Sequence, residues 1–345
     1  MRSHQFNQLI ASMAPTTNQP SKMLYRIMRK PCPSPFFELQ VKTILARISL
    51  RYFQVIPPPH LMRGLEFYIS ATLIAEKLPP RNNCVVLLLE KLTDLLALAS
   101  DDQPMLYKKR KSLALMFDGI SIQSEMNLDD PDDLVLAYTQ SMMGFLLFKP
   151  NPQSIGMIGL GGGSLAKFCY RHLPQSVISV AEIDRKVIDL RDQFFVPRDD
   201  ERFNVACVDG AEFVRGAHGE FDVLLVDGFD NDGQPAQLCS HRFYQDCHQA
   251  LAPDGLMVVN LLGGDLWQTE IYVDRMRSSF GDSVITINAL DSLNMIAFAA
   301  KGDAMKLDRD ILQKRMLQLT TLHPLILRAT AQRILAEQRA INLRQ

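Results

Sequence analysis

A glycine-rich segment, Gly159-Leu160-Gly161-Gly162-Gly163, lies between an apolar run and a helical pattern, and it constrains the fold more than any other feature. Glycines at such a point permit a tight turn and let backbone N–H groups approach a ligand closely. A glycine cluster by itself is also compatible with a plain turn. Its position directly after an apolar strand favours a binding loop, in which Gly159, Gly161 and Gly163 make the backbone contacts.

From residue 154 onward, apolar strand patterns alternate with helical patterns. The predicted strands are 154–159, 177–183, 205–208, 221–226, 256–262, 284–288 and 295–299, and the predicted helices are 164–172, 185–194, 211–214, 241–251 and 271–280. Such alternation builds a mostly parallel, doubly wound sheet that binds ligands above the carboxyl ends of its strands. The sequence therefore predicts an α/β, Rossmann-like fold with a seven-stranded sheet.

The rest of the chain divides into three further parts. Residues 1–80 are basic and partly helical in pattern, and we assign them no function. Residues 81–149 are expected to form a small β-hairpin, with its turn at Asp118-Gly119, and a helix over 134–148. Residues 150–302 form the expected Rossmann-like catalytic domain, and residues 303–345 form a helical tail that is interrupted at Pro324.

Charge and composition argue against several classes of partner. The net charge of -1 gives no sign of nucleic-acid or anionic-membrane binding, and no apolar run has the roughly 18 residues of a membrane helix. The basic excess in residues 1–80 indicates a solvated face or a poorly ordered tail, with a surface for an acidic partner as the alternative. The six cysteines lack zinc spacing and indicate buried thiols in a reducing compartment, so we expect a cytoplasmic protein.

Acidic residues follow the second and third strands. Glu182 ends the second strand about twenty residues after the glycines, where a carboxylate can accept hydrogen bonds from both ribose hydroxyls of a nucleoside. Asp184 is expected to cap the following helix. Asp209-Gly210 ends the third strand, where the carboxylate can bind an adenine amino group and the backbone N–H a ring nitrogen; a plain Asp-Gly turn is the alternative.

The fourth strand is followed by the most acidic loop of the domain, Asp227-Gly228-Phe229-Asp230-Asn231-Asp232-Gly233. Three carboxylates in six residues at one sheet edge favour a cationic guest, such as a sulfonium, a protonated amine or a metal ion. The spaced carboxylates and terminal Glu of a calcium-binding EF-hand are missing. A solvated acidic turn is the alternative.

Together these loops resemble the spermidine synthase family, in order and in spacing. That family has a hairpin ending in Gln-Ser/Cys, then Pro-Asn-Pro, Gly-Gly-Gly-Asp-Gly, Val-Glu-Ile-Asp, Asp-Gly, and Asp-Ser-Ser-Asp-Pro followed by Phe/Tyr-Tyr. The corresponding segments here are Ile122-Gln123-Ser124, Pro150-Asn151-Pro152, Gly159 to Gly163, Ala181-Glu182-Ile183-Asp184, Asp209-Gly210, Asp227 to Asp230, and Phe243-Tyr244. The resemblance covers about residues 112–300 and implies the class I methyltransferase-like form of the fold.

The resemblance implies an aminopropyltransferase that moves an aminopropyl group from decarboxylated S-adenosylmethionine to a small-molecule amine, with no metal. The cofactor would be bound by Gln123, Gly159, Gly161, Gly163, Glu182, Asp209 and Gly210. Asp227 would orient and deprotonate the amine, with Asp230 and Tyr244 around it. Self-association as a homodimer is expected on the same ground.

Two departures from the family pattern keep other functions open. The family's glycine-loop Asp, which pairs with the amino end of the aminopropyl group and repels the carboxylate of intact S-adenosylmethionine, falls here on Gly162. Gly228-Phe229 and Asn231 replace the Ser-Ser and Pro of the acidic loop, so the acceptor need not be putrescine. The alternatives are a methyltransferase that uses intact S-adenosylmethionine on the same fold, and a non-catalytic relative that binds a nucleoside or a polyamine. Retention of Asp227 and Asp230 favours the aminopropyltransferase.

Overall fold

The computed structural model of the chain describes residues 104–117, 122–229, 233–262, 266–289, 294–323, 325 and 327–342. All of them belong to one unit, Pro58–Gln345. The expected basic segment 1–80, the hairpin turn at 118–119, Pro324 and Asp230 lie outside the described residues. Within the described part of the chain, no helix is both long and apolar enough to cross a membrane.

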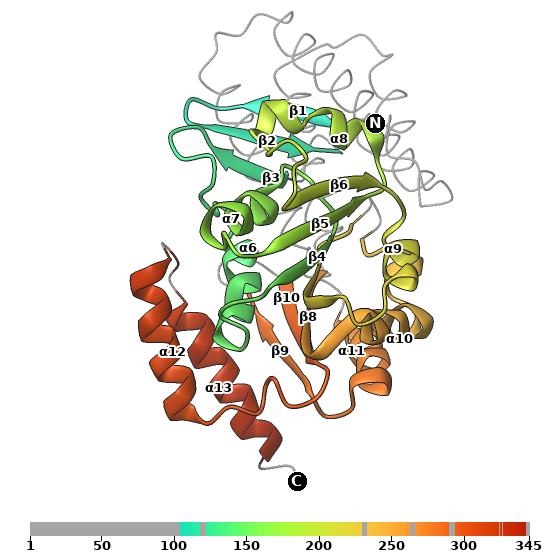
Figure 1. Cartoon of the computed structure of the whole chain (residues 1–345), viewed down its shortest axis with the longest axis vertical. Coiled ribbons are helices and arrows are strands. Elements are labelled where there is room, and N and C mark those ends of the chain that lie inside the picture. The colour runs from blue at the N-terminus through green and yellow to red at the C-terminus, as the bar shows by residue number, and fades with distance from the viewer. Residues whose placement is uncertain are drawn as a thin grey trace, which may run out of the picture. The chain divides into compact units, whose positions relative to one another are not determined.

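A seven-stranded sheet forms the centre of the domain (Figure 1). Its strands are β4 (Ser154–Ile158), β5 (Val177–Glu182), β6 (Phe203–Cys207), β7 (Phe221–Val226), β8 (Leu251–Leu262), β9 (Val284–Asn288) and β10 (Asn294–Ala300). Their order is β6-β5-β4-β7-β8-β10-β9, and β10 is antiparallel to both of its neighbours. The predicted fold class is confirmed, and the chain reverses direction across the sheet between β4 and β7, where a doubly wound sheet binds ligands.

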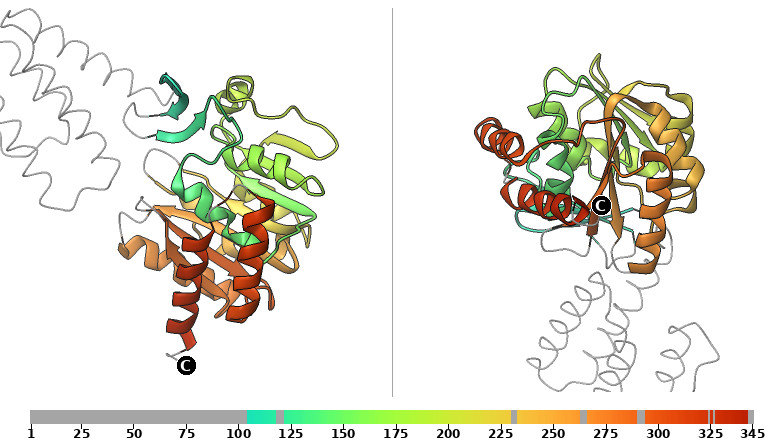
Figure 2. Two further views of the ribbon diagram at one scale, coloured as in Figure 1. Left: turned by 90° about the vertical axis from the view of Figure 1, so that its left-hand side faces the viewer. Right: turned by 90° about the horizontal axis from the view of Figure 1, so that it is seen from below.

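Helices cover both faces of this sheet. One face carries α9 (Gly210–Gly216), α10 (His241–Ala250) and α11 (Leu266–Phe280). The other carries α6 (Ala137–Met142), the 3-10 turn η1 (Met143–Leu147), α7 (Ser164–His172), α8 (Arg185–Asp189), the 3-10 turn η2 (Arg191–Phe194), α12 (Arg309–Leu322) and α13 (Arg328–Asn342). A short 3-10 turn, η3 (Ala236–Leu238), precedes α10. Seen from below, α12 and α13 lie on one side of the strands and α11 on the other (Figure 2).

The alternation of side chains along the strands supplies a separate core to each face. In β7, Val223 and Leu225 belong to the core under α6, α7, α12 and α13, whereas Leu224 and Val226 belong to the core under α10 and α11. All four side chains are fully buried. A strand buried on both faces reads as a continuous apolar run, which is why the period of two is hidden in this part of the sequence.

A three-stranded antiparallel sheet precedes the domain and touches it at the glycine loop. It consists of β1 (Met105–Lys108), β2 (Ser112–Met116) and β3 (Ile122–Asn127), so the predicted hairpin is present with one additional strand. Ser124 pairs with Leu115 but Ile122 pairs with Met116, so Gln123 is the extra residue of a β-bulge. The Ser124 hydroxyl lies 3.3 Å from that of Ser164, the first residue of α7.

The C-terminal helices are an integral part of the domain. Leu312 and Leu319 of α12 and Ile334 of α13 are buried in the same core as the sheet. Arg315 of α12 donates hydrogen bonds to the carbonyl oxygens of Leu147 (3.0 Å) and Phe148 (2.7 Å), at the end of η1. The last carbonyls of a helical segment have no partner within it, so this arginine satisfies them from another element. The α6–η1 segment is thereby attached to α12.

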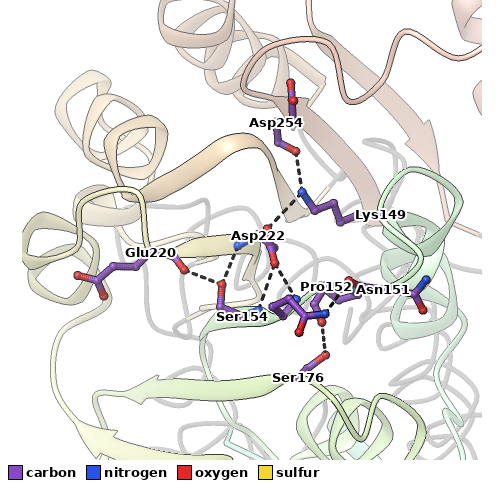
Figure 3. Close-up of polar contacts among 9 residues, drawn as sticks. Lys149, Asn151, Pro152, Ser154, Ser176, Glu220, Asp222 and Asp254 are labelled. Atoms are coloured by element: carbon purple, nitrogen blue, oxygen red, sulfur yellow. Dashed lines mark hydrogen bonds and ion pairs between the residues drawn. The ribbon is translucent and has the colours of Figure 1, made fainter.

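A polar network joins the amino ends of β4 and β7, at the edge opposite the glycine loop (Figure 3). The Asp222 carboxylate accepts hydrogen bonds from the backbone N–H of Gln153 (2.7 Å) and of Ser154 (3.3 Å), and its other oxygen lies 3.2 Å from the Lys149 ammonium. The Ser176 hydroxyl donates to the carbonyl oxygen of Pro152 at 2.6 Å. The Pro-Asn-Pro segment before β4 is therefore fixed by contacts to both neighbouring strands.

This network predicts an acid-sensitive contribution to stability. Desolvation raises the pKa of Asp222, but the N–H of Gln153 and the Lys149 ammonium outweigh it, so the pKa is lowered in the folded protein. Because the pKa of Asp222 is lower in the folded than in the unfolded protein, its ionised carboxylate stabilises the fold at pH values above the unfolded-state pKa of about 3.9. This contribution is lost as the pH falls through the folded-state pKa. We expect Asp222→Asn to lower the free energy of unfolding by about 1–2 kcal/mol at pH 7 and by less below about pH 4, in urea titrations.

Asp274 provides the matched control, because its carboxylate is exposed and pairs with Arg277 three residues on along the same helix. Asp274→Asn should change the free energy of unfolding by less than about 0.5 kcal/mol at either pH. An Asp222→Asn effect of equal size at pH 7 and pH 3.5 would contradict the assignment to the ionised carboxylate.

Candidate active site

The glycine loop adopts a backbone that other residues could not follow. Gly159, Gly161 and Gly163 have φ angles of 91°, 52° and 69°. A Cβ added to Gly159 would lie 2.3 Å from the backbone oxygen of Asp227, and one added to Gly163 would lie 2.4 Å from a methyl carbon of Val196. The loop after β4 is therefore packed directly against the loop after β7.

Glu182 connects the end of β5 to the glycine loop. Its carboxylate is buried and accepts hydrogen bonds from the backbone N–H of Leu160 (2.8 Å, to Oε2) and of Asp184 (2.9 Å, to Oε1). A carboxylate has about four acceptor positions, so two remain for further donors, and a ribose contact by Glu182 stays a prediction. Asp184 caps α8 through the N–H of Lys186, as expected.

Asp209 and Gly210 form the start of α9. The Asp209 side chain caps the helix by accepting a hydrogen bond from the N–H of Ala211 (2.7 Å), which is the plain-turn role left open from the sequence. A Cβ on Gly210 would lie 2.3 Å from a methyl carbon of Ile158 in β4, so glycine is required for close packing of the two loops. An adenine contact by Asp209 stays a prediction.

The Asp227 carboxylate accepts hydrogen bonds from two other side chains at this edge. Its Oδ1 accepts a hydrogen bond from Nδ2 of Asn260 (2.8 Å), and its Oδ2 accepts one from the Tyr138 hydroxyl (3.1 Å). Desolvation raises the pKa of Asp227, and the two hydrogen bonds oppose that rise without cancelling it. A carboxylate with a raised pKa is a stronger base, which suits it to accept a proton from a substrate.

Tyr138 and Asn260 are the two site residues that sequence reasoning missed. Tyr138 comes from α6, outside the loops that follow the strands, and no sequence pattern places that helix beside Asp227. Asn260 had a signal, because it is the one side-chain amide in the apolar run of β8 and is only 2% exposed. A buried polar side chain within an apolar strand needs a partner, and here that partner is Asp227.

Gly162 stands where the family has an aspartate, and the space that a side chain would need there is occupied by neighbouring residues. A Cβ on Gly162 would lie 2.6 Å from the Ser124 hydroxyl and 2.9 Å from the ring of Phe194. Phe194 is buried, and its carbonyl oxygen accepts a hydrogen bond from the buried ammonium of Lys167 (2.8 Å). Desolvation lowers the pKa of that ammonium to about 8. A side chain at position 162 would therefore require movement of a fixed neighbour.

Three predicted site residues remain: Gln123, Tyr244 and Asp230. Gln123 occupies the β3 bulge, and its carbonyl oxygen lies 3.5 Å from the Tyr138 hydroxyl. Tyr244 is fully buried in α10, and its hydroxyl has no hydrogen-bond partner in the described part of the chain. Asp230 lies outside the described residues. The roles predicted for these three residues stay predictions. Across the described ranges, no group of three His, Cys, Asp or Glu side chains is arranged to hold a metal ion.

The sheet order and the glycine loop define a Rossmann-like domain of the class I methyltransferase type. Residues 135–289 match the spermine/spermidine synthase domain. The polyamine aminopropyltransferase of Chromobacterium violaceum is 38% identical over 196 residues, which are 56% of this chain and 75% of that protein. The chain therefore belongs to the polyamine aminopropyltransferase family, as its loops predicted, and it is a transferase.

Solved structures agree on the fold. A probable spermidine synthase from Corynebacterium glutamicum has a TM-score of 0.52 at 18% identity, over 62% of this chain and 83% of that one. Human methyltransferase-like protein 13, in complex with SAH, has a TM-score of 0.51 at 23% identity, over 54% of this chain and 92% of that one. Because both kinds of enzyme share the fold, the fold alone does not choose between them. The sequence relatives favour aminopropyl transfer over the methyltransferase alternative.

Proposed function

We propose that the chain transfers an aminopropyl group from decarboxylated S-adenosylmethionine to a small amine. The observation that supports the proposal is the close packing of Gly159 against the backbone of Asp227. The proposed base would therefore lie directly beside the loop that would bind the nucleoside. The bound cofactor would supply a sulfonium, which is a good leaving group and requires no metal. Glu182 would bind the ribose, Asp209 and Gly210 the adenine, and Gln123 and the backbone of the glycine loop the rest of the nucleoside.

Asp227 would carry the acid–base step. An amine is protonated near pH 7 and becomes a nucleophile only after it loses a proton. The Asp227 carboxylate would bind the ammonium, accept its proton, and hold the nitrogen in line with the carbon next to sulfur. Tyr138 and Asn260 would keep the carboxylate oriented, since each donates to a different oxygen of it. Asp230 and Tyr244 would surround the rest of the amine.

Side-by-side calorimetry and turnover assays with the decarboxylated and the intact cofactor test this function. We expect tighter binding of the decarboxylated form and transfer to at least one of putrescine, cadaverine and spermidine. Methyl transfer from the intact form would support the methyltransferase alternative. Binding of either nucleoside without turnover of any amine would support the non-catalytic alternative.

The packing around Gly162 predicts the effect of introducing the aspartate that the family has at this position. Because a Cβ at this position meets Ser124 and Phe194, Gly162→Asp is expected to lower the free energy of unfolding by about 1–3 kcal/mol. Phe194→Leu in the same chain should restore part of that loss and permit a stronger preference for the decarboxylated cofactor. Thermal unfolding and calorimetry measure the two effects. An unchanged melting temperature for Gly162→Asp alone would contradict the packing argument.

We also propose that the protein is cytoplasmic. Cys169, Cys239 and Cys247 are buried free thiols, which supports the location expected from composition. We further propose that the chain self-associates as a homodimer, and light scattering of the purified protein measures this directly.

A further inference from the structure

We propose that Asn294 is a positioning residue that fixes the orientation of the Asn260 amide and, through it, the carboxylate of Asp227. This inference rests on the proposed function for the role of Asp227. Asn294 opens β10, and Asn260 lies in β8 opposite Ile296. Opposed residues of antiparallel strands point to the same face, so Asn294 and Asn260 are diagonal neighbours on one side of the sheet.

The three side chains form a directed series of hydrogen bonds. Nδ2 of Asn294 donates to Oδ1 of Asn260 (2.9 Å), and Nδ2 of Asn260 donates to Oδ1 of Asp227 (2.8 Å). A carboxamide carries an acceptor on one side and donors on the other, and a half-turn about its last bond exchanges them. In the turned state, the Asn260 oxygen would face the carboxylate, and two acceptors would meet.

The orientation of the Asn260 amide matters because this side chain is buried. Asn260 is only 2% exposed, so water does not replace a missing partner for its oxygen or its amino group. The donor from Asn294 strengthens the preference for this orientation, because it binds the Asn260 oxygen on the side away from Asp227. Without it, the amide could turn, and Asp227 would lose one of the two donors that stabilise its charged form. Among the described residues, the titratable group that faces Asp227 is Tyr138, which approaches the other oxygen from α6.

Two substitutions separate this role from simple packing. Asn294→Leu removes the donor at similar volume, and Asn294→Asp replaces it by an acceptor of the same shape that should turn the Asn260 amide. We expect the acid limb of the kcat/KM profile to move up by about one pH unit in Asn294→Leu and by more in Asn294→Asp. The kcat at the pH optimum should fall by roughly tenfold or more, which corresponds to one lost directed hydrogen bond to a charge. The KM for the cofactor should stay unchanged.

The matched control is Asn204→Leu, which removes an exposed asparagine that bonds Asp199 at the end of the sheet, far in strand order from β10. It should leave the acid limb in place. In an Asn260→Leu background, Asn294→Leu should add no further shift, because the intermediate amide is gone. An independent effect of Asn294→Leu in that background would overturn the proposal, as would an unchanged acid limb in both single variants of Asn294.

Carbon-13 NMR of the aspartate carboxyls keeps the two proposals distinguishable. It reads the pKa of Asp227 without turnover, and the resonance is identified by its loss in Asp227→Asn. A raised Asp227 pKa in Asn294→Leu would support the positioning role even if no aminopropyl transfer occurred. The same Asp227 pKa in the wild type and in both folded Asn294 variants would reject it, whatever the enzyme's activity.

Discussion

Replacing Asp227 by asparagine is expected to lower kcat for amine transfer by about 10²–10⁴-fold. The amide has nearly the shape of the carboxylate but does not take up a proton or stabilise an ammonium. The nucleoside contacts proposed for Glu182 and Asp209 come from other strands, so the Kd for the decarboxylated cofactor should change by less than about threefold. Steady-state kinetics with a saturating amine and calorimetry of the cofactor measure these two quantities.

Asp222→Asn is the control for this experiment, because Asp222 lies in the network at the opposite edge of the sheet. It should retain kcat at neutral pH at a temperature well below its melting point. A variant of Asp227 that still turns over at a tenth of the wild-type rate or faster would show that another group removes the proton.

Gly159→Ala is expected to lower the free energy of unfolding by about 2–5 kcal/mol. A side chain at a φ of 91° costs about 1–2 kcal/mol in backbone strain, and overpacking adds about 1–3 kcal/mol. The added carbon would lie 2.3 Å from a backbone oxygen of Asp227, which is not the end of a flexible side chain. Because the substitution pushes the two loops apart, cofactor binding and kcat should fall together. Urea titrations and calorimetry test this.

Gly216 offers the contrasting position. It ends α9, has no atom within 4 Å of an added Cβ, and does not have a positive φ. Gly216→Ala should therefore be neutral or stabilise the protein by up to about 1 kcal/mol. Equal losses of stability at the two positions would indicate that the close approach of the loops is not what requires glycine at position 159.

The central fold could be predicted because continuous apolar runs, which are typical of buried strands, alternate with helical patterns along the sequence. α7, β7 and β9 have the predicted bounds. The predicted helix 185–194 instead divides at Leu190 into α8 and the turn η2. The difference is local, because the change from an α-helix to a 3-10 helix leaves the side-chain pattern almost unaltered.

The strand over 256–262 was predicted too short for a reason that the pattern hides. β8 begins at Leu251, immediately after α10, and includes Pro253 and Asp254, the latter with a φ of 57°. Proline and a left-handed residue normally argue against a strand. Here they occupy an irregularity in the pairing with β7, where Phe221 pairs with Leu251 but Val223 pairs with Leu256.

The site was predictable only where its residues follow strands. Asp227 and Glu182 lie at strand ends, so the fold class alone brings their loops to one edge of the sheet. Tyr138 contacts Asp227, and Asn294 contacts Asn260, through packing between elements far apart in the chain, which periodicity does not report. The fit of Phe194 against Gly162 was equally hidden, since it depends on distances between side chains.

The attachment of α12 to η1 has a practical meaning for anyone who shortens this chain. The helical segment that carries Tyr138 continues into η1, whose final carbonyls are satisfied by Arg315. Removal of residues 303–345 would expose apolar side chains of the core and leave the carbonyl oxygens of Leu147 and Phe148 without this hydrogen-bond donor. We expect the loss to shift α6 and therefore Tyr138, which contacts Asp227. Shortened forms of the chain should therefore keep α12 and α13.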